Sequence, residues 1–411
     1  MDQTLKSLLE KELLRQRQTL SLIASENYCS EAVIHAQSSV ATNKYAEGYP
    51  HKRYYAGCQV VDEIENLAIA RLKTLFGVEY ANVQPHSGSQ ANLAVFQACL
   101  GPDDCYMGLD LNDGGHLSHG CRVNISGQNY NAVSYHVDKE TELLDYDQIE
   151  ALAKIHKPKM IIAGYSAYAP SIDWQRFRQI ADSVGAYLHA DIAHIAGLIA
   201  AGLYPSPVPY ADVITSTTHK TLRGPRGGLI MVPRSEELAK RVDKAIFPGI
   251  QGGPMMMTIA AKAAAFYEAL QPDFKHYQQQ VLNNASAMAS RFQEQGFDLV
   301  SGGTQSHLFM VKLDRHGLTG KEIEHVLESV HILVNKNSIP GDTRSPFITS
   351  GIRIGTPGIT TRGLVEDQAK QLADWMIKVI MNKDDQKILG EIKKDVLAMA
   401  NKFTIYDGFE R

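Results

Sequence analysis

The chain has 411 residues, of which 44% are hydrophobic and 21% are charged, and its formal net charge at pH 7 is −4. This length predicts more than one domain, and the composition is that of an ordinary globular protein. Because there is no basic excess, nucleic acid and membrane surfaces are not expected as main partners.

The five cysteines are odd in number and form no Cys-x-x-Cys pair, which argues against a disulfide framework or a zinc site. Free thiols are typical of a reducing compartment, so a cytoplasmic location is expected. Residues 1–20 have a charged, amphipathic helical pattern without the apolar segment of a signal peptide. The sequence contains no run of about 18 apolar residues that would predict a membrane span.

Short apolar runs alternate with helical patterns through the first two thirds of the chain. The apolar runs predict strands at 81–84, 106–109, 160–163, 186–190, 211–214 and 229–232. The helical patterns cover 62–76, 89–100, 146–155 and 174–184. This alternation predicts an α/β fold with a mostly parallel sheet that carries helices on both faces.

The pattern changes in the last third. Two long helical patterns, at 258–269 and 274–295, precede short strands at 308–313 and 332–334, a helix that starts near 319, and a C-terminal helix at about 363–381. We therefore expect a helical arm at 1–20, a large α/β domain at 21–275 and a smaller α+β domain at 276–411. No Pro/Gly-rich linker marks the boundary.

Two neighbouring strand patterns end in residues that carry chemistry. The first is followed by Asp191 and His194, and the second by Thr217, His219 and Lys220. Ligands of open α/β sheets bind at the carboxyl ends of the strands, so an acid and a lysine are predicted to face one crevice. Pyridoxal phosphate needs such a pair, because its aldehyde forms a Schiff base with lysine and its ring nitrogen needs a carboxylate. The alternatives are a loop lysine and an Asp191 that only caps a helix.

The string His86–Gln90 lies between a predicted strand and a predicted helix. Gly88 allows close backbone approach, Ser87 and Ser89 add hydroxyl groups, and a helix N-terminus favours anions. These features predict a phosphate-binding loop. An ordinary serine N-cap is the alternative.

Three further features are each open to a plainer explanation. His116 lies between glycines and could stack on a pyridine ring, or it is only a solvated loop residue. Arg353 follows Gly351 on a short strand and could clamp a carboxylate, or it is a surface arginine. The tyrosine-rich segment 42–58, which we call the tyrosine loop, contains Glu47 and could line a site, or it is only a packed loop.

Seven strings resemble those of serine hydroxymethyltransferase, a fold-type I pyridoxal-phosphate enzyme family. They cover almost the whole chain in the family's order: LIASEN, TNKYAEGYP, NVQPHSGSQAN, GGHLSHG, VITSTTHKTLRGPRGG, FPGIQGGP and TSGIRIGTPGITTRG. The resemblance implies the fold-type I architecture and an obligate dimer, or a dimer of dimers, with shared active sites.

The resemblance also implies roles for individual residues. Catalytic roles are implied for Lys220, Glu47, Tyr55, His219 and Asp191. Cofactor-binding roles are implied for Ser87, Gly88, Ser89, His116, Asp191, His194, His219, Lys220, Arg226, Tyr45 and Gly253, of which Tyr45 and Gly253 reach across from a second subunit. Substrate contacts are implied for Ser25, Tyr55 and Arg353, and folate contacts for Glu47, Tyr54, Leu111, Gly115, Leu117 and Asn337. No metal is implied.

The implied activity is the reversible conversion of serine and tetrahydrofolate into glycine and 5,10-methylenetetrahydrofolate. A paralogue that acts as a β-hydroxy amino acid aldolase, or on a related serine- or threonine-like substrate, is the alternative enzyme, and a non-catalytic binding protein is an alternative of a different class. The retained folate-side residues argue against the first alternative, and the complete catalytic set argues against the second. Ser38, His51, Ala56 and Gly358 depart from the family pattern, and their effect on specificity stays open.

Overall fold

The computed structural model describes residues 1–408, and the chain divides into two compact units. The large unit is Asn27–Gln278, and the second unit is Met1–Glu26 together with Gln279–Arg411. The predicted division into an arm at 1–20 and domains at 21–275 and 276–411 remains a prediction.

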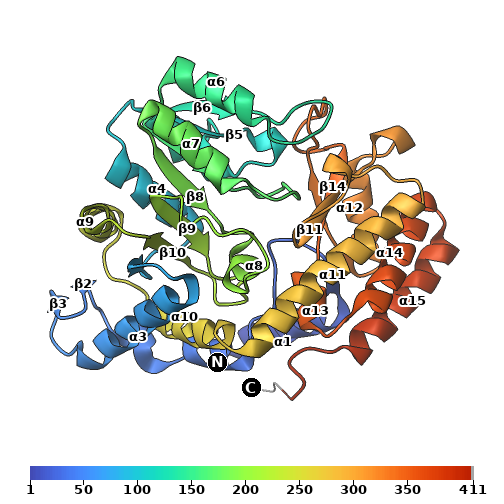
Figure 1. Ribbon diagram of the computed structural model, residues 1–411. Helices are drawn as coiled ribbons and strands as arrows, with labels where there is room; N and C mark the ends of the chain where they lie inside the picture. The colour runs from blue at the N-terminus through green and yellow to red at the C-terminus, as the bar shows by residue number, and fades with distance from the viewer. Residues whose placement is uncertain (409–411) are drawn as a thin grey trace. The chain divides into compact units, whose positions relative to one another are not determined.

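A seven-stranded sheet forms the centre of the large unit (Figure 1). Its strand order is β4-β10-β9-β8-β7-β5-β6. The strands are β4 (Tyr80–Asn82), β5 (Cys105–Leu109), β6 (Asn131–Tyr135), β7 (Met160–Ala163), β8 (Tyr187–Asp191), β9 (Val213–Thr217) and β10 (Gly228–Val232). Only β10 among these strands runs antiparallel to its neighbours, so the predicted mostly parallel sheet is confirmed.

Strand β9 runs three residues beyond the predicted 211–214 segment. Ser216 and Thr217 are polar, but both are buried and pair with Leu229 and Gly228 of β10. Pairing with β10 therefore extends β9 to Thr217, three residues before Lys220. Strand β6 was not predicted, because its sequence, NAVSY, is short and half polar.

Helices cover both faces of the sheet, as predicted. Helices α4 (Gly88–Cys99) and α9 (Glu236–Lys244) lie on one face, and α6 (Tyr146–His156) and α7 (Trp174–Val184) lie on the other (Figure 1). Val95 and Phe96 of α4 pack with Met160 and Ile162 of β7, whereas Ile161 points to the opposite face, as the alternation of a strand requires. Burial of these apolar faces holds the layers together.

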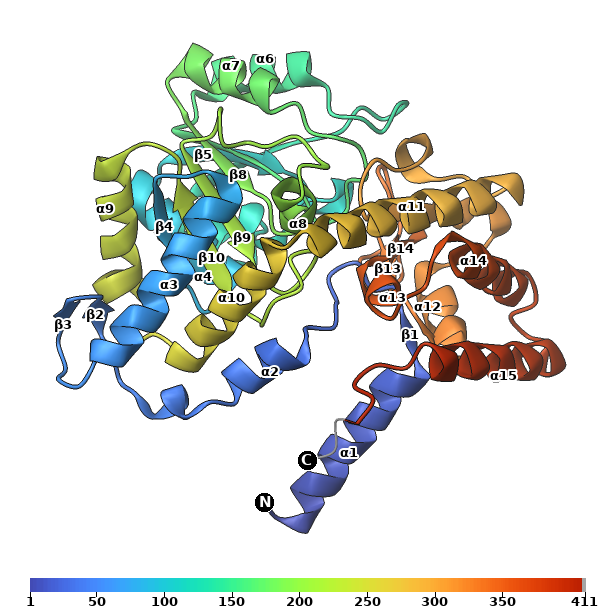
Figure 2. The same cartoon turned by 60° about the horizontal axis from the view of Figure 1, so that its bottom comes forward.

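The remaining elements of the large unit lie at its edges. They are α2 (Glu31–Gln37), β2 (Gly48–Tyr49), β3 (Lys52–Arg53), α3 (Gln59–Phe76), α5 (Ile125–Asn129), α8 (Ala196–Ala200), α10 (Met256–Ala269) and the first part of α11 (Pro272–Glu294). In both Figure 1 and Figure 2, the β2–β3 hairpin lies beyond α3, on the side away from α8.

The second unit contains a three-stranded antiparallel sheet in the order β11-β14-β13 and a short parallel pair, β1–β12. Its elements are α1 (Gln3–Gln18), β1 (Leu20–Ser21), β11 (Leu308–Lys312), α12 (Gly320–Ser329), β12 (Ile332–Leu333), β13 (Asn335–Asn337), β14 (Gly351–Gly355), α13 (Pro357–Thr361), α14 (Glu366–Met381) and α15 (Gln386–Lys402). The predicted α+β character is therefore confirmed.

Helix α1 has no buried residue, although four of its leucines lie on it in a helical pattern. Leu5, Leu8, Leu9 and Leu14 are 46–56% exposed. The helix is attached at its C-terminal end, where the Arg362 guanidinium donates to the carbonyls of Gln16 and Thr19 at 2.9 and 3.2 Å. The rest of α1 extends away from α15 (Figure 2).

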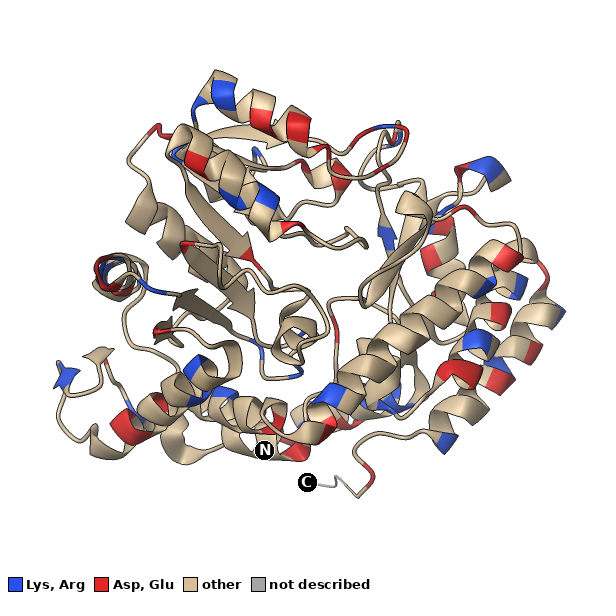
Figure 3. Ribbon diagram, viewed as in Figure 1, with Lys and Arg blue, Asp and Glu red and all other residues tan. Residues whose placement is uncertain are grey.

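Charged side chains lie mainly on the helices and loops of each unit, and both signs are mixed there (Figure 3). Within residues 1–408, no helix combines the length and the apolar character that would let it cross a membrane.

Candidate active site

Lys220 is buried three residues beyond the end of β9. Its side chain is 9% exposed, and Nζ donates a hydrogen bond to Thr217 Oγ1 at 2.9 Å. Its backbone carbonyl accepts a hydrogen bond from Asn27 Nδ2 at 2.9 Å. A buried amine held at a strand end in this way is suited to form a Schiff base with an aldehyde.

Asp191 is the last residue of β8, the strand that lies parallel to β9. Its Oδ2 accepts hydrogen bonds from His119 Nε2 and Asn92 Nδ2, each at 2.8 Å. Burial alone would raise the pKa of Asp191, but the hydrogen bond and charge of His119, together with His116 and Asn92, hold that pKa well below its usual value. The carboxylate therefore stays ionised and can stabilise a cation at the strand ends.

Asn92 connects Asp191 to the loop that carries His116. Besides its bond to Asp191, Asn92 Nδ2 donates to Ser118 Oγ at 2.8 Å, and Ser118 Oγ lies 2.7 Å from His116 Nδ1. Thr215 Oγ1 of β9 donates to Asn92 Oδ1 at 2.6 Å. One amide therefore links the ends of β5, β8 and β9 through α4.

The sequence analysis missed His119, Asn92 and Ser118 as site residues. A weak signal was available, because His119 follows His116 by three positions and Asn92 lies one helical turn after Ser89. No pattern in the chain indicates that the three side chains meet at Asp191.

The predicted phosphate-binding loop is the N-terminus of α4. Ser87 is the N-cap, and its Oγ accepts from the Gln90 N–H at 3.2 Å, so the capping interpretation is confirmed, while phosphate binding stays a prediction. A Cβ at Gly88 would lie 2.7 Å from Thr217 Cγ2, and one at Gly228 would clash with the Ser87 carbonyl oxygen. The loop is therefore packed directly against the two segments on either side of Lys220.

His219 and Arg226 lie beside this loop on the segment that joins β9 to β10. Arg226 Nη1 lies 3.3 Å from His219 Nε2. Burial, and then the charges of Lys220 and Arg226, lower the pKa of His219 to about 3. A neutral histidine between two cations is suited to donate a hydrogen bond to an anion. His194 is also buried near the strand ends, and its carbonyl accepts from Thr221 Oγ1 at 2.9 Å.

The tyrosine loop presents three of its aromatic rings, those of Tyr45, Tyr54 and Tyr55, at the surface of the large unit. Tyr54 is 75% exposed and packs on Phe247 with ring centroids 5.5 Å apart. Tyr45 donates to Glu47 Oε1 at 3.3 Å, and its ring contacts the ring of Tyr55 at 5.0 Å. Gly253 packs on the Tyr45 ring, so any Cβ there would lie 3.3–3.4 Å from it. The structure therefore groups Tyr45, Glu47, Tyr54, Tyr55 and Gly253 together.

Three predicted folate residues lie in the loop after β5, on either side of His116. Leu111 and Leu117 are 38% and 49% exposed, whereas Gly115 is buried, with no space for a side chain beside the Leu109 carbonyl. Exposed leucines next to a candidate ring-stacking histidine offer an apolar surface to a flat ligand.

Arg353 is buried in β14, the middle strand of the second unit's sheet. Its Nε donates to Asn335 Oδ1 at 2.9 Å, and Asn335 faces it directly on β13. Burial lowers the pKa of Arg353 to about 10. A bound carboxylate would favour the charged guanidinium. Asn337, at the end of β13, and half-buried Ser25 belong to the same unit, and Asn335 is a positioning residue that the sequence analysis missed.

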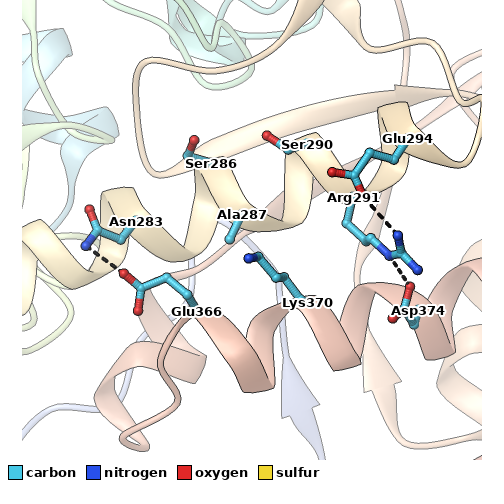
Figure 4. Close-up of a pocket in the computed structure, with 9 residues that line it drawn as sticks. All are labelled: Asn283, Ser286, Ala287, Ser290, Arg291, Glu294, Glu366, Lys370 and Asp374. Atoms are coloured by element: carbon cyan, nitrogen blue, oxygen red, sulfur yellow. Dashed lines mark hydrogen bonds and ion pairs between the residues drawn. The ribbon is translucent and has the colours of Figure 1, made fainter.

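A cavity of about 550 Å³ contains none of these residues. It lies between α11 and α14, and Arg291, Asp374, Glu294 and Glu366 in its lining bond to other lining residues (Figure 4). Arg291 bonds Asp374 and Glu294 at 2.5 and 2.9 Å, and Glu366 accepts from Asn283 at 2.8 Å. We therefore place the active site at the strand ends. Within the described residues, no group of three or more His, Cys, Asp or Glu side chains is arranged to hold a metal ion.

The arrangement as a whole defines the class of protein. A mostly parallel sheet carries a buried carboxylate at the end of β8 and a buried lysine just beyond the end of the adjacent β9, and a helix N-terminus packs against the segments on either side of that lysine. This architecture is that of the fold-type I pyridoxal-phosphate enzymes.

Comparisons with known proteins give the family within this class. A profile described as "Serine hydroxymethyltransferase" matches residues 1–376. The chain is 58% identical over 406 residues to the serine hydroxymethyltransferase of Psychrobacter sp. strain PRwf-1, covering 99% of this chain and 97% of that protein. It is 57% identical over 405 residues to the enzyme of Methylococcus capsulatus and 58% identical over 405 residues to that of Legionella pneumophila strain Lens, in each case covering 98% of this chain and 97% of the relative. The chain therefore belongs to the serine hydroxymethyltransferase family.

Proposed function

We propose that this protein interconverts serine and tetrahydrofolate with glycine and 5,10-methylenetetrahydrofolate, with pyridoxal 5'-phosphate held as a Schiff base on Lys220. The observation that carries the proposal is the pairing of buried Lys220 and ionised Asp191 on adjacent parallel strands, next to the N-terminus of α4. The near full-length identity to enzymes of this name supports the same activity.

The side chains at the strand ends fit the cofactor by type and by packing. Lys220 supplies the amine for the aldehyde, Asp191 pairs with the ring nitrogen, and His116 lies against the ring. The phosphate is bound by the serines and backbone N–H groups at the N-terminus of α4, where Gly88 leaves room for close approach. The full proposed set is Ser87, Gly88, Ser89, His116, Asp191, His194, His219, Lys220 and Arg226, with Tyr45 and Gly253 from the partner subunit.

When pyridoxal phosphate is bound, its protonated ring would withdraw electrons from the α-carbon of the substrate. The side chains of the protein hold the cofactor and the substrate and set their protonation. Asp191 keeps the ring nitrogen protonated, because the hydrogen bonds from His119 and Asn92 keep its carboxylate ionised. His219, neutral through burial, donates a hydrogen bond to the phosphate.

The substrate carboxylate binds the guanidinium of Arg353, assisted by Ser25. Asn335 accepts a hydrogen bond from Arg353 Nε and so orients the planar guanidinium, a group that can bind a carboxylate through two parallel hydrogen bonds. Glu47 moves the proton between the substrate hydroxyl and folate, with Tyr55 beside it. The folate contacts are Glu47, Tyr54, Leu111, Gly115, Leu117 and Asn337.

We propose a homodimer with shared active sites. The β2–β3 hairpin of the tyrosine loop lies beyond α3, on the side away from α8 (Figures 1 and 2), and this position supports a role of Glu47 and Tyr55 in the site of a neighbouring subunit. The exposed rings of the tyrosine loop and the four exposed leucines of α1 supply apolar surface for this contact. The five free cysteines support the proposed cytoplasmic location.

The test is an absorbance spectrum of the purified protein, alone, with glycine, and with glycine plus tetrahydrofolate, and the Lys220→Ala variant is the control. The proposal expects a visible cofactor band that Lys220→Ala loses, and a spectral change with glycine that grows when folate is added. A response to glycine that ignores folate would indicate an aldolase instead. A colourless protein that does not take up pyridoxal phosphate would refute the proposal.

A further inference from the structure

A fully buried lysine lies behind the phosphate-binding loop and has no role in the chemistry described above. Lys262 is on α10 and is only 1% exposed. Its Nζ donates to the carbonyl oxygens of Val83, Pro85 and Gly228 at 2.7, 3.1 and 2.7 Å. The three carbonyls match the three hydrogens of an ammonium group.

These carbonyls belong to two strands at the point where their ladder ends. The β4–β10 pairing stops at Asn82 and Ile230, so Val83, Pro85 and Gly228 lie beyond the regular ladder. A buried carbonyl needs a partner, and Pro85 has no N–H with which to continue the pairing. The Lys262 ammonium therefore supplies hydrogen bonds to these carbonyls where the regular β4–β10 pairing has ended.

The two segments joined by Lys262 are those that form the phosphate-binding loop. Pro85 leads directly into His86–Gln90, and the Gly228 N–H also donates to the Pro85 carbonyl at 3.0 Å. Gly227, next to Arg226, packs on the lysine stem, because a Cβ there would lie 2.6 Å from Lys262 Cε. Lys262 therefore helps to fix the position of the loop relative to Arg226, together with the Gly228 N–H and with Gln251, which bonds His86 N and the Gln84 carbonyl.

Burying a charged amine costs free energy of folding, so stability alone is a poor explanation for Lys262. Burial lowers the pKa of Lys262 to about 7, against the opposing influence of Glu65. Apolar side chains of similar volume often stabilise a protein as well as a buried charge does. A role in shaping the phosphate site accounts for a cation at this position.

We propose that Lys262 is a positioning residue that holds Val83–Ser89 and the start of β10 in the geometry that binds the cofactor's phosphate group. This inference rests on the proposed function. It predicts that Lys262 acts on the phosphate end of the cofactor and not on the aldehyde or the ring.

The test compares the dissociation constants of pyridoxal phosphate and of pyridoxal, which lacks the phosphate, for the cofactor-stripped protein, followed by the visible band. Lys262→Met keeps the length of the side chain and removes the donors. We expect Lys262→Met to bind pyridoxal phosphate about tenfold more weakly, which is the effect of losing about one charged hydrogen bond. Binding of pyridoxal should stay within about twofold of wild type. Arg362→Met is the matched control, because Arg362 is a buried cation of the second unit that donates to the carbonyls of Gln16, Thr19, Arg17 and Ala400.

Equal weakening of both ligands, or of neither, would overturn the proposal. If Lys262→Met does not fold, Lys262→Gln, which keeps two N–H donors, is measured in the same way. Failure of both variants to fold while Arg362→Met folds would assign Lys262 to stability alone and would also overturn the proposal. If the wild-type protein forms a band with neither ligand, the proposed function has failed and not the role of Lys262.

Discussion

At the scale of single residues, the site depends on groups whose burial fixes their charge. His189 and His219 are kept neutral by burial, whereas Asp191 is kept ionised by its hydrogen bonds. His189 lies within β8, with Nε2 2.7 Å from Thr215 Oγ1, which in turn donates to Asn92. His189, Thr215, Asn92, Asp191 and His119 therefore form one polar network under the strand ends.

This network predicts that acid destabilises the protein well above the pH at which carboxylates titrate. Burial lowers the pKa of both His189 and His219 from 6.5 to about 3. The two histidines bind protons near pH 6.5 in the unfolded chain but only near pH 3 in the folded chain. Their contribution to the free energy of unfolding is therefore fully present above pH 6.5 and is lost as the pH falls toward 3. Urea unfolding across this range measures it, and His189→Gln is expected to reduce the slope by up to about 1.4 kcal/mol per pH unit. A free energy of unfolding that is flat across the range would contradict the prediction.

His51, one of the departures from the family pattern, occupies a position with φ of +63°. The family usually has glycine there, and a left-handed conformation costs an L-residue roughly 1–2 kcal/mol. We expect His51→Gly to raise the free energy of unfolding by up to about 1 kcal/mol, after the entropy cost of glycine. Thermal unfolding is the measurement. Lys52→Gly, in the adjacent strand β3, is the control and is expected to destabilise.

At the scale of elements, the tyrosine loop is held on the large unit by one buried arginine. The Arg53 side chain is 3% exposed and bonds Asp62 and Glu65 of α3 at 2.8 and 2.6 Å. Its Nη1 donates to the carbonyls of Ala46 and Gly48 at 2.9 and 2.8 Å. Those two residues flank Glu47, so Arg53 sets the backbone position of the proposed proton carrier.

Arg53→Met is therefore expected to lower the free energy of unfolding by about 3 kcal/mol, because it leaves two buried carboxylates without a cation. The effect on Glu65 is largest, since burial already raises its pKa and the charge of Arg53 opposes that shift. Denaturant unfolding measures the change. The neighbouring exposed Lys52→Met is the control and should stay within about 0.5 kcal/mol of wild type. A similar small change in Arg53→Met would show that the loop is held in another way.

The elements also show how far periodicity predicts structure. Predicted strand 160–163 and predicted helix 174–184 have the bounds of β7 and α7, because their apolar patterns are unbroken. Helix α15 was omitted, although Leu389, Ile392, Val396 and Met399 are spaced for one buried face. The predicted strand 211–214 ended three residues before the end of β9. Ser216 and Thr217 are polar, but pairing with β10 keeps them in the strand and buried.

At the scale of the whole molecule, the proposed function requires that two chains complete each site. Glu47 and Lys220 then act in one site only when they come from different subunits. This arrangement can be tested without a structure of the dimer, by combining two variants that are each inactive.

We expect Glu47→Gln to bind pyridoxal phosphate but to lose folate-dependent turnover, and Lys220→Ala to lose turnover as well. The two variants are then mixed, unfolded together and refolded. Activity should return to roughly a quarter of wild type, because about half of the dimers contain one chain of each variant and each such dimer has one intact site out of two. Each variant refolded by itself is the control. A mixture that stays inactive would place both residues in a site formed by one chain, and unchanged turnover of Glu47→Gln alone would remove Glu47 from the mechanism.

The sequence by itself determined the class of fold and the residues with reactive groups. Apolar periodicity is a local property, and Lys220, Asp191 and the Ser87–Ser89 loop follow strand patterns that can be found from neighbouring residues alone. The family resemblance added roles that no spacing could supply, such as that of Arg353. Only the tertiary structure decided that His119 and Asn92 meet at Asp191, that Asn335 holds Arg353, and that Lys262 joins β4 to β10. These contacts join residues far apart in the chain, and whether a buried polar group finds its partner depends on the order and register of the strands, which periodicity does not specify.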